Sequence, residues 1–150
     1  MNTKRTHRLL PLAIALVMAL SLLPTKAWGY YVLQGSGTEA SPYLISSAQA
    51  LESLAEQVND GALKTEGVYF RQTADIDLSG FKNNSWVPIG NATGSGGTGR
   101  TFDGIYDGNG FRIKNFVFED TTRKYYGLFG LLSNTAVIKN LTLDKSCSAT

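Results

Sequence analysis

The chain carries two copies of one short motif in its second half, and this internal repeat limits its possible folds more than any other feature. Residues 113–119 (Ile-Lys-Asn-Phe-Val-Phe-Glu) return at 138–144 as Ile-Lys-Asn-Leu-Thr-Leu-Asp, an offset of 25 residues. A second matching piece at 104–107 corresponds to 127–130, an offset of 23 residues. Such spacing is typical of solenoids, and apolar residues alternate within each copy as in strands. We therefore expect an all-β solenoid in which each copy forms one coil.

Residues 1–29 have the features of a secretory signal peptide. A basic segment opens the chain, with Lys4, Arg5, His7 and Arg8. A 15-residue apolar run follows at 9–23, which is shorter than the roughly 20 residues that a bilayer span needs. Small residues allow cleavage after Ala27 or after Gly29, and the sequence does not decide between them. The alternative is an uncleaved membrane anchor.

Removal of the signal peptide changes the charge and takes away the one histidine, His7. The mature chain keeps ten of the fourteen Lys and Arg residues and all twelve acids, a net charge of −2. No basic surface for nucleic acid is therefore expected. Without histidine, a Ser-His-Asp triad and a His-ligated zinc site are excluded. Cys147 is the single cysteine, so it either pairs between molecules or packs as a small buried side chain.

One helix is expected upstream of the repeat. Its apolar face follows from residues at helical spacing, which are Leu51, Leu54, Ala55 and Val58. Ser46 and Gln49 form a capping box at its start, and residues 59–61 (Asn-Asp-Gly) end it. We expect this amphipathic helix to cover the open first coil, because terminal caps prevent such stacks from joining end to end.

Strands and corners are expected on either side of this helix and in the repeat. Apolar and polar residues alternate over 68–78, which predicts a strand in which Gln72 points inward and needs a hydrogen-bond partner. In each copy of the repeat an asparagine separates two apolar pairs. This pattern predicts a corner with left-handed backbone at Asn115 and Asn140. We expect the two asparagines to stack one coil apart through their amides.

A glycine-rich loop at 91–100 matches two nucleotide-binding patterns. Residues 94–99 satisfy G-x-G-x-x-G, and 94–101 approach a phosphate-binding loop with Arg100 in place of lysine. Both chemistries need a strand before the glycines and a helix after them, because helix N–H groups hold the phosphates. Strand-like residues 101–103 follow instead, so we expect a connecting loop and no nucleotide.

Four aspartates are the candidate site residues, namely Asp75, Asp77, Asp103 and Asp107. Asp75 and Asp77 are expected on one outward face, where a neighbouring coil would bring Asp103 close. Paired carboxylates cleave glycosidic bonds and clustered carboxylates bind Ca²⁺. Asp107 lies in an Asp-Gly-Asn-Gly turn, where aspartate is common for local reasons. Solvated or turn acids are the favoured interpretation over a calcium site or a catalytic pair, so no catalytic, cofactor-binding or metal residue is assigned.

Residues 127–130 (Gly-Leu-Phe-Gly), followed by 138–143, resemble the GLUG motif of bacterial secreted and surface proteins. The upstream segments are similar in order to the N-terminal part of such proteins, at 37–39, 42–45, 74–78, 86–90, 102–104 and 107–110. The resemblance implies a right-handed parallel β-helix, pectate-lyase-like in architecture, found in adhesin-like proteins and beside peptidase domains in immunoglobulin A peptidases. It carries over no catalytic residue, because the motif is structural. Such proteins continue through further coils, so truncation after residue 150 is expected.

The expected function is a secreted or cell-surface scaffold or adhesion module, non-catalytic and without cofactor, which presents strand faces and loops to a host protein or glycan. The first alternative is the N-terminal part of a polysaccharide lyase or glycoside hydrolase on the same fold, using Asp75, Asp77 or Asp103. A third interpretation is a truncated reading frame whose last coil exposes Leu141, Leu143 and strand edges. Fold alone does not decide between them.

Overall fold

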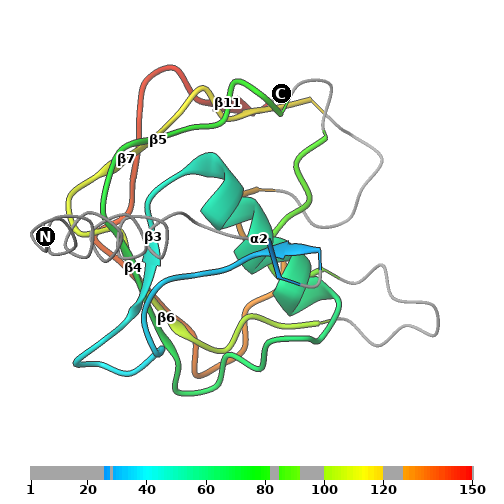
Figure 1. The fold of residues 1–150 in the computed structure, drawn as a ribbon. Coiled ribbons are helices and arrows are strands. Elements are labelled where there is room, and N and C mark those ends of the chain that lie inside the picture. Colours follow the sequence, from blue (N-terminus) through cyan, green and yellow to red (C-terminus); the bar gives the residue numbers. More distant parts are fainter. Residues whose placement is uncertain (1–25, 28, 82–84, 92–99, 120–126, 150) are drawn as a thin grey trace, which may run out of the picture.

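A computed structural model describes residues 26–27, 29–81, 85–91, 100–119 and 127–149, and the elements of this described part are short strands and one helix (Figure 1). The greater part of the expected signal peptide and the glycine pattern at 94–99 lie outside the described residues. The elements run in the order β1 (Lys26–Ala27), β2 (Tyr30–Tyr31), β3 (Tyr43–Ile45), α2 (Ala48–Asn59), β4 (Tyr69–Gln72), β5 (Ile76–Asp77), β6 (Ile105–Asp107), β7 (Arg112–Lys114), β8 (Val117–Phe118), β9 (Val137–Lys139), β10 (Thr142–Leu143) and β11 (Ser148–Ala149).

Three of the four sheets are parallel throughout. Their strand orders are β3-β4-β6-β9, β5-β7-β10 and β8-β11, and the fourth sheet is the antiparallel pair β1-β2. Each parallel neighbour comes from the next traverse of the chain around the core. We call these traverses passes: β3 lies in the first, β4 and β5 in the second, β6 to β8 in the third, and β9 to β11 in the fourth. The first corner separates the β4–β6–β9 sheet from the β5–β7–β10 sheet, and the second corner follows the latter sheet.

One pass is longer than the sequence repeat, which corrects an expectation. Ile105 pairs with Val137, a separation of 32 residues, and the third and fourth passes keep a similar separation at the second sheet. The repeated Ile-Lys-Asn therefore marks a corner, not a coil. Asn115 lies at the second corner of the third pass and Asn140 at the first corner of the fourth, so the two do not stack as expected. Both have the predicted left-handed backbone, with φ of 54° and 53°.

The alternating segment 68–78 is divided between two sheets. β4 and β5 are separated by the first corner, so the single expected strand is two strands that keep the predicted inward and outward positions. Gln72 is fully buried, as the alternation predicts. Its amide nitrogen donates to the carbonyl of Ala74 (2.9 Å) and of Arg112 (3.1 Å), and its oxygen accepts from the Tyr106 hydroxyl (3.3 Å). These bonds tie the first corner of the second pass to the third pass.

Helix α2 lies across the start of the stack. Its buried face includes the predicted Leu51, Leu54, Ala55 and Val58, which join the same core as Phe70 and Tyr106. In Figure 1 the helix lies in the middle of the view, with the strands drawn around it. The N-cap is one residue later than expected, because the Ser47 hydroxyl, not that of Ser46, accepts from the Ala50 N–H (3.2 Å). The expected Ser46–Gln49 capping box is therefore absent.

Candidate functional site

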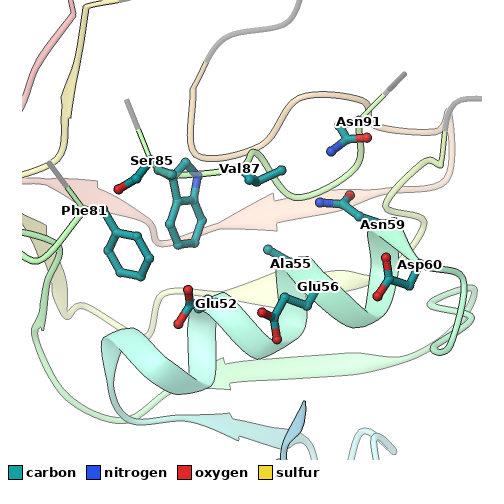
Figure 2. Close-up of a pocket in the computed structure, with 10 residues that line it drawn as sticks. Glu52, Ala55, Glu56, Asn59, Asp60, Phe81, Ser85, Val87 and Asn91 are labelled. Carbon is teal, nitrogen blue, oxygen red and sulfur yellow. The ribbon is translucent and has the colours of Figure 1, made fainter. Parts of the chain in front are cut away.

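A surface cleft of about 350 Å³ lies between α2 and the segment that follows β5. Figure 2 shows its walls. The lining residues come from α2 and its C-cap on one side and from residue 81 and residues 85–91 on the other, and they are Glu52, Ala55, Glu56, Asn59, Asp60, Phe81, Ser85, Trp86, Val87 and Asn91. The cleft therefore joins two segments that are well separated in sequence.

The helix wall of the cleft is acidic. Glu52, Glu56 and Asp60 recur every four residues, a spacing that puts side chains on one face of a helix. All three line the cleft, and Figure 2 shows Glu52 and Glu56 one turn apart on α2. Asp60 accepts from the Tyr30 hydroxyl (2.7 Å), and this hydrogen bond raises the pKa of Tyr30. One wall thus presents carboxylates at intervals of one turn.

The facing wall is apolar and firmly packed. Phe81 packs edge-on against Trp86, with ring centroids 5.2 Å apart and planes at 88°. Trp86 is buried, and its indole N–H donates to the Leu128 carbonyl (3.4 Å). Val87 is 45% exposed beside it. This wall therefore offers an aliphatic surface supported by aromatic rings from the core.

Asn59, at the last turn of α2, joins the two walls. Its amide nitrogen donates to the Pro88 carbonyl (3.0 Å), and its amide oxygen accepts from the Gly90 N–H (3.0 Å). Both ends of one amide are used, so the spacing of the walls is set without a ligand. A preformed cleft of this kind loses less entropy on binding than one that must order first.

Three of the four candidate aspartates, Asp75, Asp77 and Asp107, lie elsewhere, at the corners, where they bind backbone and neighbouring side chains. One Asp77 oxygen accepts from the Ser79 N–H (2.8 Å) and the Asn115 amide (3.0 Å). One Asp107 oxygen likewise accepts from the Asn109 N–H (2.9 Å) and the Asn140 amide (2.9 Å). Each aspartate therefore closes its own turn and holds the following pass.

These contacts lower the pKa values of the corner acids. The side-chain hydrogen bond from Asn115 holds the pKa of Asp77 below its usual value, and the bond from Asn140 does the same for the pKa of Asp107. The bond from the Lys114 ammonium lowers the pKa of Asp75, whose other oxygen accepts from the Arg112 N–H. A general acid in glycoside cleavage needs a raised pKa, whereas the pKa values of these aspartates are lowered.

The expected approach of Asp103 to Asp75 and Asp77 is not observed. Asp103 accepts from the Thr101 hydroxyl (2.9 Å), and its N–H donates to the Thr65 hydroxyl (2.8 Å), so its partners lie apart from those of the other two acids. Within the described part of the chain, no group of three or more His, Cys, Asp or Glu residues is placed to hold a metal ion. Cys147 is half-buried, with its sulfur 3.2 Å from the Ile113 carbonyl oxygen.

Sequence reasoning missed the cleft. The four-residue spacing of Glu52, Glu56 and Asp60 was a readable signal for one acidic helix face. The facing wall had no such signal, because Trp86 and Val87 approach α2 only through the fold. In the described ranges, no helix is long and apolar enough to cross a membrane.

Comparison with known proteins gives two relatives that are much longer than this chain. The chain is 33% identical over 112 residues to a protein of Evansella cellulosilytica whose name describes a Gly-rich membrane protein; the match covers 73% of this chain and 12% of that protein. It is 34% identical over 121 residues to Halomucin of Haloquadratum walsbyi, covering 77% of this chain and 1% of that protein. No family model matches the chain, and no solved structure gives a significant match. The chain thus corresponds to a small part of each relative.

Proposed function

We propose that this chain is an exported, non-catalytic scaffold or adhesion module built as a right-handed parallel β-helix. The observation that carries the proposal is the shared register of the parallel sheets, in which strands of successive passes lie directly on one another. Right-handed crossover between parallel strands is the rule in proteins. The helix over the first pass fits the terminal cap that a stacked architecture requires.

Export to the cell surface is supported from two sides. The basic and apolar segments of residues 1–29 have the order of a signal peptide. The name of the Evansella relative describes a membrane protein. A surface or membrane-associated location agrees with both.

The non-catalytic assignment rests on the use of the corner acids. Asp77 and Asp107 each hold a turn and the next pass through one oxygen, and their pKa values are lowered. A carboxylate committed in this way is a poor proton donor to a leaving group. The acids therefore serve the stack, and a lyase or hydrolase centred on them is the less favoured function.

The partner that fits the cleft is a glycan. Carboxylates and amides accept and donate to sugar hydroxyls, while an aliphatic wall covers the C–H face of a ring. Glu52, Glu56 and Asn91 offer the polar groups, and Val87 with Phe81 offers the apolar surface. The fixed wall spacing set by Asn59 favours a rigid sugar ring over a flexible chain.

The test is binding of the purified chain to an array of neutral and uronate-containing oligosaccharides. We expect binding without cleavage, and Glu56→Ala should weaken it by about tenfold, the loss expected for one hydrogen bond to a charged group. Glu39→Ala removes an exposed carboxylate outside the cleft and should leave binding unchanged. If the chain instead cleaves a uronate substrate and the Asp77→Asn variant loses this activity, the chain is an enzyme.

A further inference from the structure

A second hollow, of about 280 Å³, lies on the surface next to the cleft. It is lined by β2 and the residues after it, by β3, by α2 and by the loop that follows α2, and its lining includes Tyr30, Tyr31, Val32, Tyr43, Gln57 and Leu63. We call this site the tyrosine hollow. Among the described residues, none lines both the hollow and the cleft. The hollow is therefore a separate site that the glycan assignment of the cleft does not use.

The hydrogen bond between Tyr30 and Asp60 forms the border between the two sites. Tyr30 lines the hollow and Asp60 lines the cleft, and the Tyr30 hydroxyl donates to Oδ2 of Asp60 (2.7 Å). On α2, Gln57 of the hollow directly follows Glu56 of the cleft. Figure 2 shows Asp60 at the end of the cleft that lies away from Phe81. A ligand that leaves the cleft at this end therefore reaches the hollow directly after the Asp60 carboxylate.

Three tyrosine rings give the hollow an aromatic surface. Tyr30, Tyr31 and Tyr43 are each half-buried, so each is partly packed and partly accessible to solvent. The Tyr43 ring packs on Phe70, with centroids 5.7 Å apart, and Tyr31 packs against the core. These contacts hold the two rings in place before a ligand arrives. A fixed tyrosine ring offers an apolar face to the C–H face of a sugar and adds a polar edge.

Polar atoms of the hollow are held in place and remain available to a ligand. The Gln57 amide nitrogen donates to the Ser53 hydroxyl (3.1 Å), which donates to the Tyr31 carbonyl (2.8 Å). These bonds tie α2 to β2 and orient the Gln57 amide. Within the described part of the chain, the amide oxygen of Gln57 and the hydroxyls of Tyr31 and Tyr43 have no hydrogen-bond partner. Sugar hydroxyls both donate and accept, so they suit all three atoms.

The described lining of the hollow carries no charged side chain. A uronate ring would leave the water that solvates its carboxylate and would find no cation among these residues, which is a costly exchange. In the adjoining cleft, Glu56 and Asp60 would repel the same carboxylate. A neutral sugar avoids both costs. The charge of the two sites therefore favours neutral over acidic glycans.

We propose that the tyrosine hollow is a second sugar subsite, and that the ligand is a neutral oligosaccharide which spans the hollow and the cleft. This inference rests on the proposed function, because it extends the glycan site of the cleft to a longer ligand. One ring of the oligosaccharide lies on the tyrosines, with a hydroxyl bound to the Gln57 amide oxygen. The Asp60 oxygen that Tyr30 does not bind, Oδ1, accepts from a hydroxyl between the two rings. Because the rings are linked, binding of the second ring is intramolecular, so affinity should rise with the length of the oligosaccharide.

The test is an NMR titration of the chain with neutral oligomers of one to six sugars, namely β-1,4-linked glucose, mannose or N-acetylglucosamine, and with galacturonate oligomers of the same lengths. For at least one neutral series we expect the affinity to rise by about tenfold or more from the dimer to the tetramer. Amide signals should then shift in both sites, at 31–33 and 63 in the hollow and at 85–87 in the cleft. Galacturonate oligomers should bind about tenfold more weakly than neutral oligomers of equal length.

The outcomes separate this inference from the proposed function. Shifts confined to 85–87 at every length, or an affinity that does not depend on length, would overturn the second subsite and leave the glycan site of the cleft. Tighter binding of galacturonate would overturn the neutral ligand. Absence of binding in all four series would refute the inference even if another glycan binds the cleft. A stronger shift of the hollow signals by acetyl-Leu-Leu-amide than by the tetramers would assign the hollow to an apolar peptide and would also refute it.

Variants of the chain locate the second ring. Tyr31→Leu removes an aromatic ring from the hollow, and Gln57→Ala removes its amide oxygen. Each should lower the affinity for the tetramer to about that of the dimer, and each should leave dimer binding in the cleft unchanged. Tyr69→Leu is the matched control, because Tyr69 is half-buried like Tyr31 but lines neither site. Equal losses for Tyr31→Leu and Tyr69→Leu would overturn the proposal, and Gln57→Ala remains decisive if Tyr31→Leu unfolds.

Discussion

The two ends of the stack are built differently. At the first, α2 covers the core with Leu51 and Leu54, and the Leu44 N–H donates to the Gln34 carbonyl (2.8 Å) on the side of β3 away from β4. At the other, which we call the open end, Leu143 is 53% exposed, and among the described residues β9, β10 and β11 each pair on one side only. Parallel passes have no intrinsic end, because every pass presents the same edge to the next. The contrast teaches that termination needs residues outside the repeating pattern.

The residues that end the stack at α2 break the strand pattern in several ways at once. Ser47 caps α2, and the apolar residues of α2 recur every three or four positions instead of every two. The fourth pass keeps the alternation and the corner asparagine of the third. An end is therefore formed where the periodicity changes, and a further pass is accepted where it continues.

The largest effect is expected from shortening one leucine at each end. Leu54→Ala, at a fully buried position of α2, should lower the free energy of unfolding by about 2–5 kcal/mol, because it leaves a cavity. Leu143→Ala at the open end should lower it by less than about 1 kcal/mol, since half of that side chain is already in water. Urea unfolding curves measure both. Equal losses would mean that the two ends are equally covered in solution.

A smaller effect should follow from Gly108→Ala, which tests how closely the fourth pass lies on the third. An added Cβ would stand 2.4 Å from the Asn140 carbonyl oxygen, so the last pass must shift. We expect a loss of about 1–3 kcal/mol, as for other overpacked sites, with faster amide hydrogen exchange over 137–149. Gly80→Ala is the matched control, because no atom lies within 4 Å of its added Cβ. Unchanged exchange in the last pass would contradict the close stacking.

Next in size is the backbone strain at a corner inside the stack. Asn115 has φ of 54°, a conformation that glycine adopts freely and alanine does not. Asn115→Ala should therefore cost about 1 kcal/mol more than Asn115→Gly, although both remove the bond to Asp77. Repeating the pair at Asn140 should give a smaller difference in global unfolding if the open end frays first. A larger difference at Asn140 would mean that the last pass contributes more to global unfolding than the corner inside the stack.

The smallest effect concerns pH. The Asn115 amide lowers the pKa of Asp77 inside the stack, and the Ser146 N–H lowers the pKa of Asp144 at the open end. A folded-state pKa below the unfolded value adds stability that is complete above about pH 4 and is lost as the pH falls through the folded value. Carboxyl NMR titrations should find both pKa values below that of an unstructured aspartate. An ordinary value for Asp77 would show that its corner bond is not formed in solution.

Local patterns predicted the parts of this fold that depend on near neighbours. The inward position of Gln72, the apolar face of α2 and the left-handed Asn115 and Asn140 follow from periodicity and from intrinsic backbone preference. The length of a pass did not follow, because the visible repeat marks corners at different positions of the stack. The bonds from Asn115 to Asp77 and from Asn140 to Asp107 join residues that are more than thirty positions apart.

The cleft was also beyond local reasoning. Glu52, Glu56 and Asp60 share a helix face by their spacing alone, but the position of Trp86 and Val87 opposite them depends on the amide of Asn59 and on core packing. The corner acids drew attention in the sequence because their residue type suggests chemistry. Their hydrogen-bond partners became visible only when successive passes were placed together.

The third pass has Asp107 at its first corner and Asn115 at its second, whereas the fourth pass has Asn140 first and Asp144 second. The order of the two residue types therefore alternates between these passes. If every corner asparagine is to donate to an aspartate of the preceding pass, a pass of one order must be followed by a pass of the other order. Duplication of a single pass would place like against like at both corners, whereas duplication of two consecutive passes would preserve every bond. A lineage that lengthens or shortens such a stack through this device is therefore expected to do so in steps of two.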